Sequence, residues 1–118
     1  MSTKQERLQI RKNVFDHVRR CVVKVGSGVL TQDEGLNVKV IKRLAREISV
    51  LMDQGHQVIL VSSGAIASGM KKMGMAERPS DIPQKQAVAA IGQPRLMLEY
   101  EKSFAHHQKK AAQILLTR

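Results

Sequence analysis

Two stretches decide the fold of this chain: VVKVGSG at residues 22–28 and VILVSSGAI at residues 58–66. Each is an apolar run, rich in β-branched residues, that ends in small polar residues and glycine, as a strand does before a tight turn. The continuous apolar run at residues 57–61 predicts burial on both faces, as in a parallel sheet covered by helices. Backbone N–H groups at such endings are free to face an anion. Two endings, the first carrying Lys24, suggest a phosphate and carboxylate site.

The rest of the chain supplies helices around these strands. Apolar residues at helical spacing predict an amphipathic helix over residues 4–18, and the first strand follows at residues 20–25. Asn37 is a good cap for a helix that ends near Gly55. The apolar residues of this helix recur at the spacing of one helix face: Ile41, Leu44, Ala45, Ile48, Leu51 and Met52. A short helix is expected at residues 64–73. A run at residues 111–116 is apolar enough for a third strand.

A long helix is expected from Ser80 or Asp81 onward, with Pro83 near its first turn. Pro94 should bend it, because proline removes one intrahelical hydrogen bond and crowds the preceding turn. The expected apolar face of this helix consists of Ala87, Ala90, Ile91, Met97 and Phe104.

Alternating strands and helices indicate an α/β fold with a mainly parallel sheet and right-handed crossovers. In open sheets of this kind, ligands bind beyond the carboxyl ends of the strands. Both polar endings lie at that end, so the sequence predicts that they share one crevice.

Composition narrows the class of protein. The chain has 118 residues, 42% hydrophobic and 25% charged, which fits one small globular domain. No apolar stretch approaches the ~18 residues of a membrane span, and the charged amino terminus does not resemble a signal peptide, so a cytoplasmic location without membrane contact is expected. Cys21 is the only cysteine, which argues against a disulfide framework or a zinc site.

The formal charge of +10 raises the question of nucleic acid. Only Phe15, Tyr100 and Phe104 are aromatic, and none stands within a basic strand, so a base-stacking platform is hard to build. Solvated helix faces explain most of the basic residues better, and no nucleic-acid partner is expected.

Each ending has a structural and a functional interpretation. Lys24 is either an edge-strand lysine or a point charge for phosphate, with Gly26, Ser27 and Gly28 allowing close backbone approach. The full dinucleotide and P-loop fingerprints are both missing. Ser62 and Ser63 either cap a helix or bind an anion at its amino terminus. A nucleophilic serine is disfavoured because the first glycine of a nucleophile elbow and a nearby histidine base are lacking.

Carboxylates are informative by their positions. All ten fall on expected helices or loops and none ends a strand candidate, so no metal-binding or general-base cluster can be named. The sequence thus shows an anion cradle without the acidic groups that usually hold Mg²⁺.

Several strings in one order, VVKVGSGVLT, VILVSSGAIASG, KQAVAAIGQPRL and QILLTR, resemble the amino-terminal part of the amino acid kinase family. The resemblance runs over residues 22–118 and is closest to members that phosphorylate L-glutamate. It implies a three-layer α/β/α sandwich, truncated here. Residues 1–19 would be a helical extension and residues 20–118 the acceptor-binding part, with the nucleotide-binding part missing.

The resemblance also implies a reaction and roles. ATP, with Mg²⁺, would phosphorylate the side-chain carboxylate of L-glutamate to L-glutamate 5-phosphate, the first step of proline biosynthesis, in a cytoplasmic homo-oligomer. Lys24 would contact the transferring phosphoryl group, and Gly26 and Ser27 would form the phosphate-facing turn. Ser63 would bind glutamate, with backbone groups of Gly64 and Ala65 nearby.

Two further interpretations stay open. The chain could be a non-catalytic half-domain that binds another chain through an uncovered sheet edge. It could also come from a family member with a different carboxylate or phosphate acceptor. The isolated chain is expected to be an inactive fragment of the parent kinase.

Overall fold

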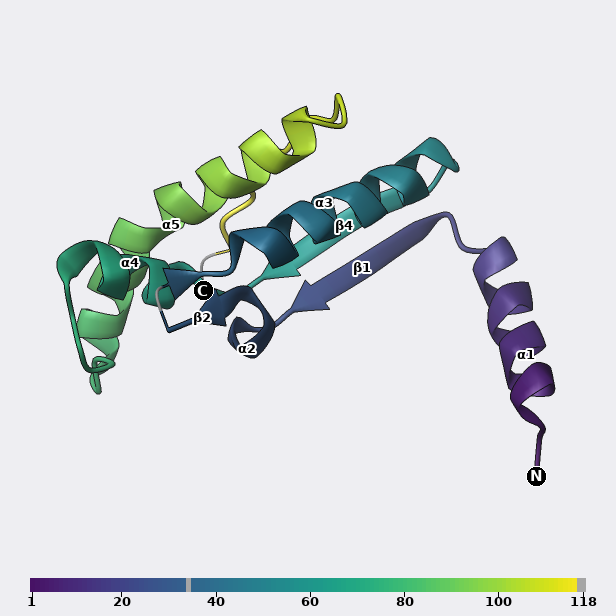
Figure 1. Ribbon diagram of the computed structural model, residues 1–118, viewed down its shortest axis with the longest axis horizontal. Helices are drawn as coiled ribbons and strands as arrows, with labels where there is room; N and C mark the ends of the chain where they lie inside the picture. Colours follow the sequence, from purple (N-terminus) through teal and green to yellow (C-terminus); the bar gives the residue numbers. More distant parts are fainter. Residues whose placement is uncertain (34, 117–118) are drawn as a thin grey trace.

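The computed structural model of the chain describes residues 1–33 and 35–116. Its helices and strands follow one another as α1 (Lys4–Asp16), β1 (Arg20–Val25), α2 (Ser27–Leu30), β2 (Thr31–Gln32), β3 (Gly35–Leu36), α3 (Val38–Asp53), β4 (Gln57–Ser62), α4 (Ala65–Met73) and α5 (Ile82–Ala105) (Figure 1). The predicted helices and the two central strands are confirmed, with ends that shift by one or two residues. The one-turn helix α2 and the small β2–β3 hairpin were not predicted.

The sheet that positions the site consists of β1 and β4. They pair in parallel, from Arg20 opposite Gln57 to Val25 opposite Ser62. The connection between them is α3, which packs back on β4 and lies beside it in Figure 1. This β–α–β unit confirms the predicted parallel α/β architecture.

The core lies between this sheet and the helices α3 and α5. Val23 and Val25 of β1, with Val58 and Leu60 of β4, face a cluster of buried side chains from the turn after β1 and from both helices: Leu30, Ile41, Ala45, Ile48, Leu96, Tyr100 and Phe104. Asn37 caps α3 as predicted, since its Oδ1 accepts a hydrogen bond from the Val40 N–H at 3.3 Å. Of the apolar face predicted for α3, Ile41, Ala45 and Ile48 are buried, whereas Met52 is 38% exposed.

The expectation of burial on both sheet faces is wrong. Alternate residues of both strands face away from α3 and α5, and Val22, Ile59 and Val61 remain 62%, 50% and 46% exposed. The radius of gyration of 17.0 Å exceeds the roughly 13 Å of a compact domain of ~100 residues. Within residues 1–33 and 35–116, helices cover one face of the sheet, and the second helical layer of the expected three-layer sandwich stays a prediction.

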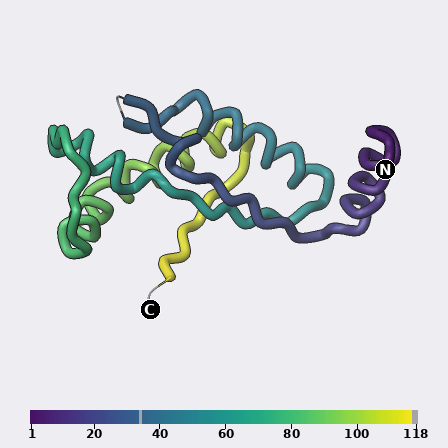
Figure 2. The backbone as a smooth tube through the Cα atoms, turned by 90° about the horizontal axis from the view of Figure 1, so that it is seen from below, coloured from purple at the N-terminus to yellow at the C-terminus, as the bar shows by residue number. Residues whose placement is uncertain are grey.

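The predicted third strand is also wrong. Residues 111–116 form no strand, and Ile114, Leu115 and Leu116 are 84%, 71% and 93% exposed. A strand requires a neighbour for its backbone N–H and C=O groups, and this segment extends away from the sheet (Figure 2). Apolar composition alone does not provide that neighbour.

Two helices differ from expectation in what they bury. In α5 the buried residues are Val88, Gly92, Leu96, Tyr100, Ser103 and Phe104. Of the predicted face Phe104 is buried and Ile91 and Met97 are half-buried, whereas Ala87 and Ala90 are exposed. The helix is continuous through Pro94, and the expected bend there stays a prediction. Asp81 caps α5 as predicted, through a 3.1 Å hydrogen bond from the Gln84 N–H. Helix α1 buries no residue and stands apart from the other helices in Figures 1 and 2. The edge of one ring faces the other where Phe15 of α1 meets His56, with ring centroids 5.9 Å apart.

Candidate functional site

The two polar strand endings meet at one edge of the sheet. Val25, the last residue of β1, lies opposite Ser62, the last residue of β4. The Ser63 N–H then donates a 3.0 Å hydrogen bond to the Val25 carbonyl, which extends the pairing one residue beyond β4. The parallel register thus brings the two motifs together, as the sequence predicted. A crevice between them stays a prediction.

The first ending presents Lys24, Gly26 and Ser27 at this edge. Lys24 is exposed on the uncovered face of the sheet, opposite Val61 of β4. Gly26 precedes α2, and Ser27 is its first residue. A Cβ placed on Gly26 or Gly28 would meet nothing within 4 Å, so the space beside this turn is open to a ligand.

The second ending presents Ser63, Gly64 and Ala65. Ser63 is exposed, whereas Gly64 is buried and precedes α4 with a φ of +111°. A side chain at Gly64 would be strained at that φ, and its Cβ would lie 3.3 Å from Leu36 Cδ2. Glycine is therefore required here by both conformation and space, and it brings the backbone to the start of α4.

The sequence did not predict the hydrogen bonds that link Tyr100 and Ser62 to the Ser63 carbonyl. The hydroxyls of Ser62 and Tyr100 lie 2.7 Å apart, and the Ser62 hydroxyl also donates a 2.9 Å hydrogen bond to the Ser63 carbonyl. Tyr100 is 3% exposed, and its ring stacks on Phe104. Burial raises the pKa of the Tyr100 phenol above its usual value. No local sequence signal could link these two residues, which are 38 positions apart.

A second missed feature is the glycine crossing between α4 and α5. A Cβ on Gly92 would lie 1.8 Å from the Ala65 carbonyl oxygen, and one on Gly69 would lie 1.9 Å from the Val88 carbonyl oxygen. The two helix backbones therefore touch where these glycines meet. This contact fixes the first turn of α4, which includes Ala65 of the candidate site.

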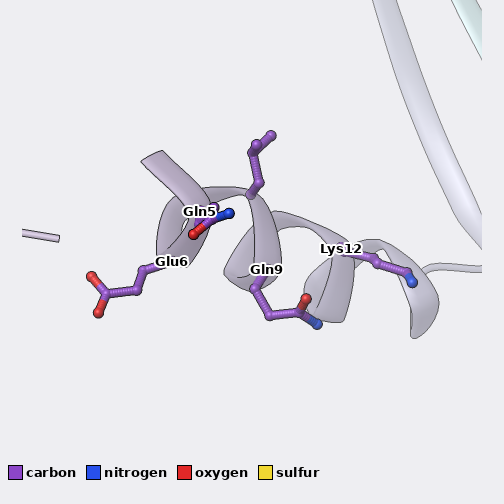
Figure 3. Close-up of a pocket in the computed structure, with 5 residues that line it drawn as sticks. Gln5, Glu6, Gln9 and Lys12 are labelled. Carbon is purple, nitrogen blue, oxygen red and sulfur yellow. The ribbon is translucent and has the colours of Figure 1, made fainter. Parts of the chain in front are cut away.

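The hollow of about 540 Å³ along α1 is not a candidate site. It is bounded by five residues of that one helix, all exposed, and their side chains spread apart (Figure 3). No second element closes over them, whereas small-molecule sites bury most of their ligand.

Metal binding and membrane crossing have no support in the described part of the chain. Residues 1–33 and 35–116 hold no group of three or more His, Cys, Asp or Glu side chains that could bind a metal ion. None of the helices in these ranges combines the length and apolar character that a bilayer crossing demands.

The class of protein follows from the fold first. A parallel β–α–β unit whose strands end together, each in a glycine turn that leads to a helix, defines an α/β protein with its candidate ligand edge at the carboxyl ends of the strands. Residues 19–118 match the model of the amino acid kinase family. The chain belongs to that family.

Curated relatives narrow the comparison. A glutamate 5-kinase of Pelobacter propionicus is 56% identical over 110 residues, which cover 92% of this chain and 30% of the relative. Those of Desulfotalea psychrophila and Thermus thermophilus are 51% and 50% identical and cover 93% and 84% of this chain. The chain spans about 30% of the length of these relatives. Helix α1 lies outside the family match.

Proposed function

We propose that this chain is the acceptor-binding part of an ATP-dependent kinase that phosphorylates the side-chain carboxylate of L-glutamate. The observation that carries the proposal is the shared edge at Val25 and Ser62, where the two endings that the family resemblance assigns to phosphate and acceptor lie side by side. The identity of 50–56% to proteins named glutamate 5-kinase supports glutamate as the acceptor.

The proposed reaction forms a bond between a glutamate carboxylate oxygen and the γ-phosphorus of ATP. The bond from that phosphorus to the β,γ-bridging oxygen breaks, and ADP leaves. The products are ADP and L-glutamate 5-phosphate, and no proton is transferred. Because the chemistry needs little covalent help from the protein, catalysis rests on positioning and on cations near the transferring group.

Each ending has a role in this proposal. Lys24 supplies a positive charge for the oxygens of the transferring phosphoryl group, and Gly26 and Ser27 bring backbone N–H groups to the phosphates. Ser63 donates its hydroxyl to the acceptor carboxylate, while Gly64 and Ala65 offer N–H groups at the start of α4, where the helix dipole favours an anion.

The described residues do not fit a resident Mg²⁺ site, because they provide no carboxylate cluster at this edge. No step is therefore assigned to a metal here, although kinases of this type use Mg²⁺ with ATP. Following the family resemblance, we also propose that residues 20–118 are the acceptor-binding part and residues 1–19 an extension. We further propose a cytoplasmic, homo-oligomeric parent enzyme.

A chimera tests the proposal. Residues 20–118 replace the matching region of the Pelobacter propionicus relative, and acyl phosphate is trapped with hydroxylamine in the presence of ATP and L-glutamate. The chimera should form γ-glutamyl hydroxamate, and the isolated chain should form none. In the chimera, Lys24→Ala should lower kcat by about 10²-fold, the loss typical of removing one transition-state donor.

Lys42→Ala is the matched control, since Lys42 is an exposed lysine of α3 that belongs to neither strand ending. Its kcat should stay within about twofold of the unmodified chimera, as is usual for surface substitutions. An inactive chimera that is folded, or an unchanged kcat after Lys24→Ala, would refute the proposed roles.

A further inference from the structure

The hydrogen bonds that join Tyr100, Ser62 and the Ser63 carbonyl have a defined donor and acceptor order. Ser62 has one hydroxyl proton, and that proton is donated to the Ser63 carbonyl at 2.9 Å. The 2.7 Å contact with Tyr100 must then be a hydrogen bond that the phenol donates to the Ser62 oxygen. The resulting hydroxyl chain runs from Tyr100 through Ser62 to the Ser63 carbonyl.

The end of this hydroxyl chain determines how one peptide group faces. The Ser63 carbonyl belongs to the peptide between Ser63 and Gly64, and in a planar trans peptide the C=O and the following N–H point in opposite directions. A carbonyl held toward Ser62 therefore turns the Gly64 N–H to the other side. Among the residues that the structure describes, this N–H has no hydrogen-bond acceptor.

The backbone of Gly64 has to be held by its neighbours, because glycine has little conformational preference of its own. With no Cβ it adopts positive and negative φ about equally well, yet here it is held at +111°. The preceding peptide group, between Ser62 and Ser63, is also held, because the Ser63 N–H donates a 3.0 Å hydrogen bond to the Val25 carbonyl. The hydroxyl chain and this hydrogen bond together fix both peptide groups of Ser63.

We propose that Tyr100 is a positioning residue of the acceptor site, whose hydroxyl acts through Ser62 to fix the Ser63–Gly64 peptide and turn the Gly64 N–H toward the acceptor carboxylate. The last step rests on the proposed function. The orientation of the peptide does not, and it can be measured on the chain itself.

Amide NMR spectra of the ¹⁵N-labelled 118-residue chain test the orientation. Tyr100→Phe keeps the buried ring and removes only the hydroxyl, and Ser62→Ala removes the middle of the hydroxyl chain. Both should move the Ser63 and Gly64 amide signals, and Ser62→Thr, which keeps a hydroxyl, should restore them. Ser49→Ala is the matched control, because it removes a buried serine hydrogen bond of 2.6 Å to Ala45 within α3.

Kinetics of the chimera test the consequence. Tyr100→Phe and Ser62→Ala should each raise the KM for glutamate about three- to tenfold, as expected for one hydrogen bond, with the KM for ATP unchanged. The double variant should raise it no further, because both changes interrupt the same hydroxyl chain.

The outcomes separate the two ideas. Unmoved Gly64 signals in both single variants would overturn the positioning role. Moved signals with an unchanged KM for glutamate would overturn its link to the acceptor. Moved signals together with a folded but inactive chimera would support the fixed peptide and count against the proposed function.

Discussion

Replacing Gly92 by alanine should destabilise this protein more than its small size suggests. The added Cβ would lie 1.8 Å from the Ala65 carbonyl oxygen and 2.4 Å from the Gly69 nitrogen. Real Cβ atoms essentially never come closer than 3.0 Å to a neighbour, so α4 and α5 must separate by about 1.2 Å at this point. Both contacted atoms belong to helix backbone, which cannot turn aside as a flexible side chain can.

The magnitude follows from two opposing effects. A gap of 0.5–1 Å already costs packed atoms about a quarter to a half of their dispersion energy, and overpacking of this kind costs about 3 kcal/mol or more. Alanine regains roughly 1 kcal/mol through its better helix propensity. The expected net loss is about 2 kcal/mol in the free energy of unfolding, or about 1 M in the urea midpoint at an m-value near 2 kcal/mol/M.

Urea unfolding followed by circular dichroism measures this loss. Gly28→Ala is the matched control, because a Cβ on Gly28, a helical residue in α2, meets nothing within 4 Å. Its free energy of unfolding should change by less than about 1 kcal/mol, with any gain coming from helix propensity. A Gly92→Ala protein with the midpoint of the unmodified chain would refute the close backbone contact between α4 and α5.

Three further predictions concern single residues. Burial raises the pKa of Tyr100, so the stability from its neutral phenol is complete below about pH 10 and is lost as pH rises through the higher folded-state pKa. Tyr100 is the only tyrosine and tryptophan is absent, so phenolate absorbance should titrate above pH 10 in the folded chain. Gly64→Ala would place a Cβ on a residue with a φ of +111°, 3.3 Å from Leu36 Cδ2. The substitution should lower the free energy of unfolding by about 1–3 kcal/mol, and a urea midpoint equal to that of the unmodified chain would contradict this. Asn37→Ala removes the cap hydrogen bond to Val40 and should cost about 1 kcal/mol by the same measurement, whereas Asn37→Gly should cost only a few tenths.

The sequence predicted elements well where local patterns carry the information. The apolar spacing of α3 predicted the inward face that includes Ile41, Ala45 and Ile48, all buried. The strand endings were identified from composition alone, and their proximity followed from the rule that parallel strands end at the same edge. The sequence therefore suffices to assign Lys24 and Ser63 to one edge of the sheet.

Prediction failed where the deciding contact lies far along the chain. In α5 apolar residues occur around the whole helix, so periodicity did not single out the buried series at Val88, Gly92, Leu96 and Tyr100. Residues 111–116 have the composition of a strand, yet a strand also requires a partner. The hydrogen bond between the Ser62 and Tyr100 hydroxyls joins β4 to α5, and these residues are 38 positions apart in the sequence. Each of these depends on packing rather than on local propensity.

Two of the strings that carry the family resemblance have a structural role as well. SSGAIASG contains Ser62 and Gly69, and KQAVAAIGQ contains Gly92. Gly69 and Gly92 bring the backbones of α4 and α5 into contact, and Tyr100, two turns beyond Gly92, reaches Ser62 behind the site. Because α5 touches both the start of α4 and the end of β4, a change in α5 can alter the candidate acceptor site without touching a ligand. A loss of glutamate affinity on substitution in either string is therefore not proof of direct contact, and the unfolding free energy of each such variant has to be measured before a binding role is assigned.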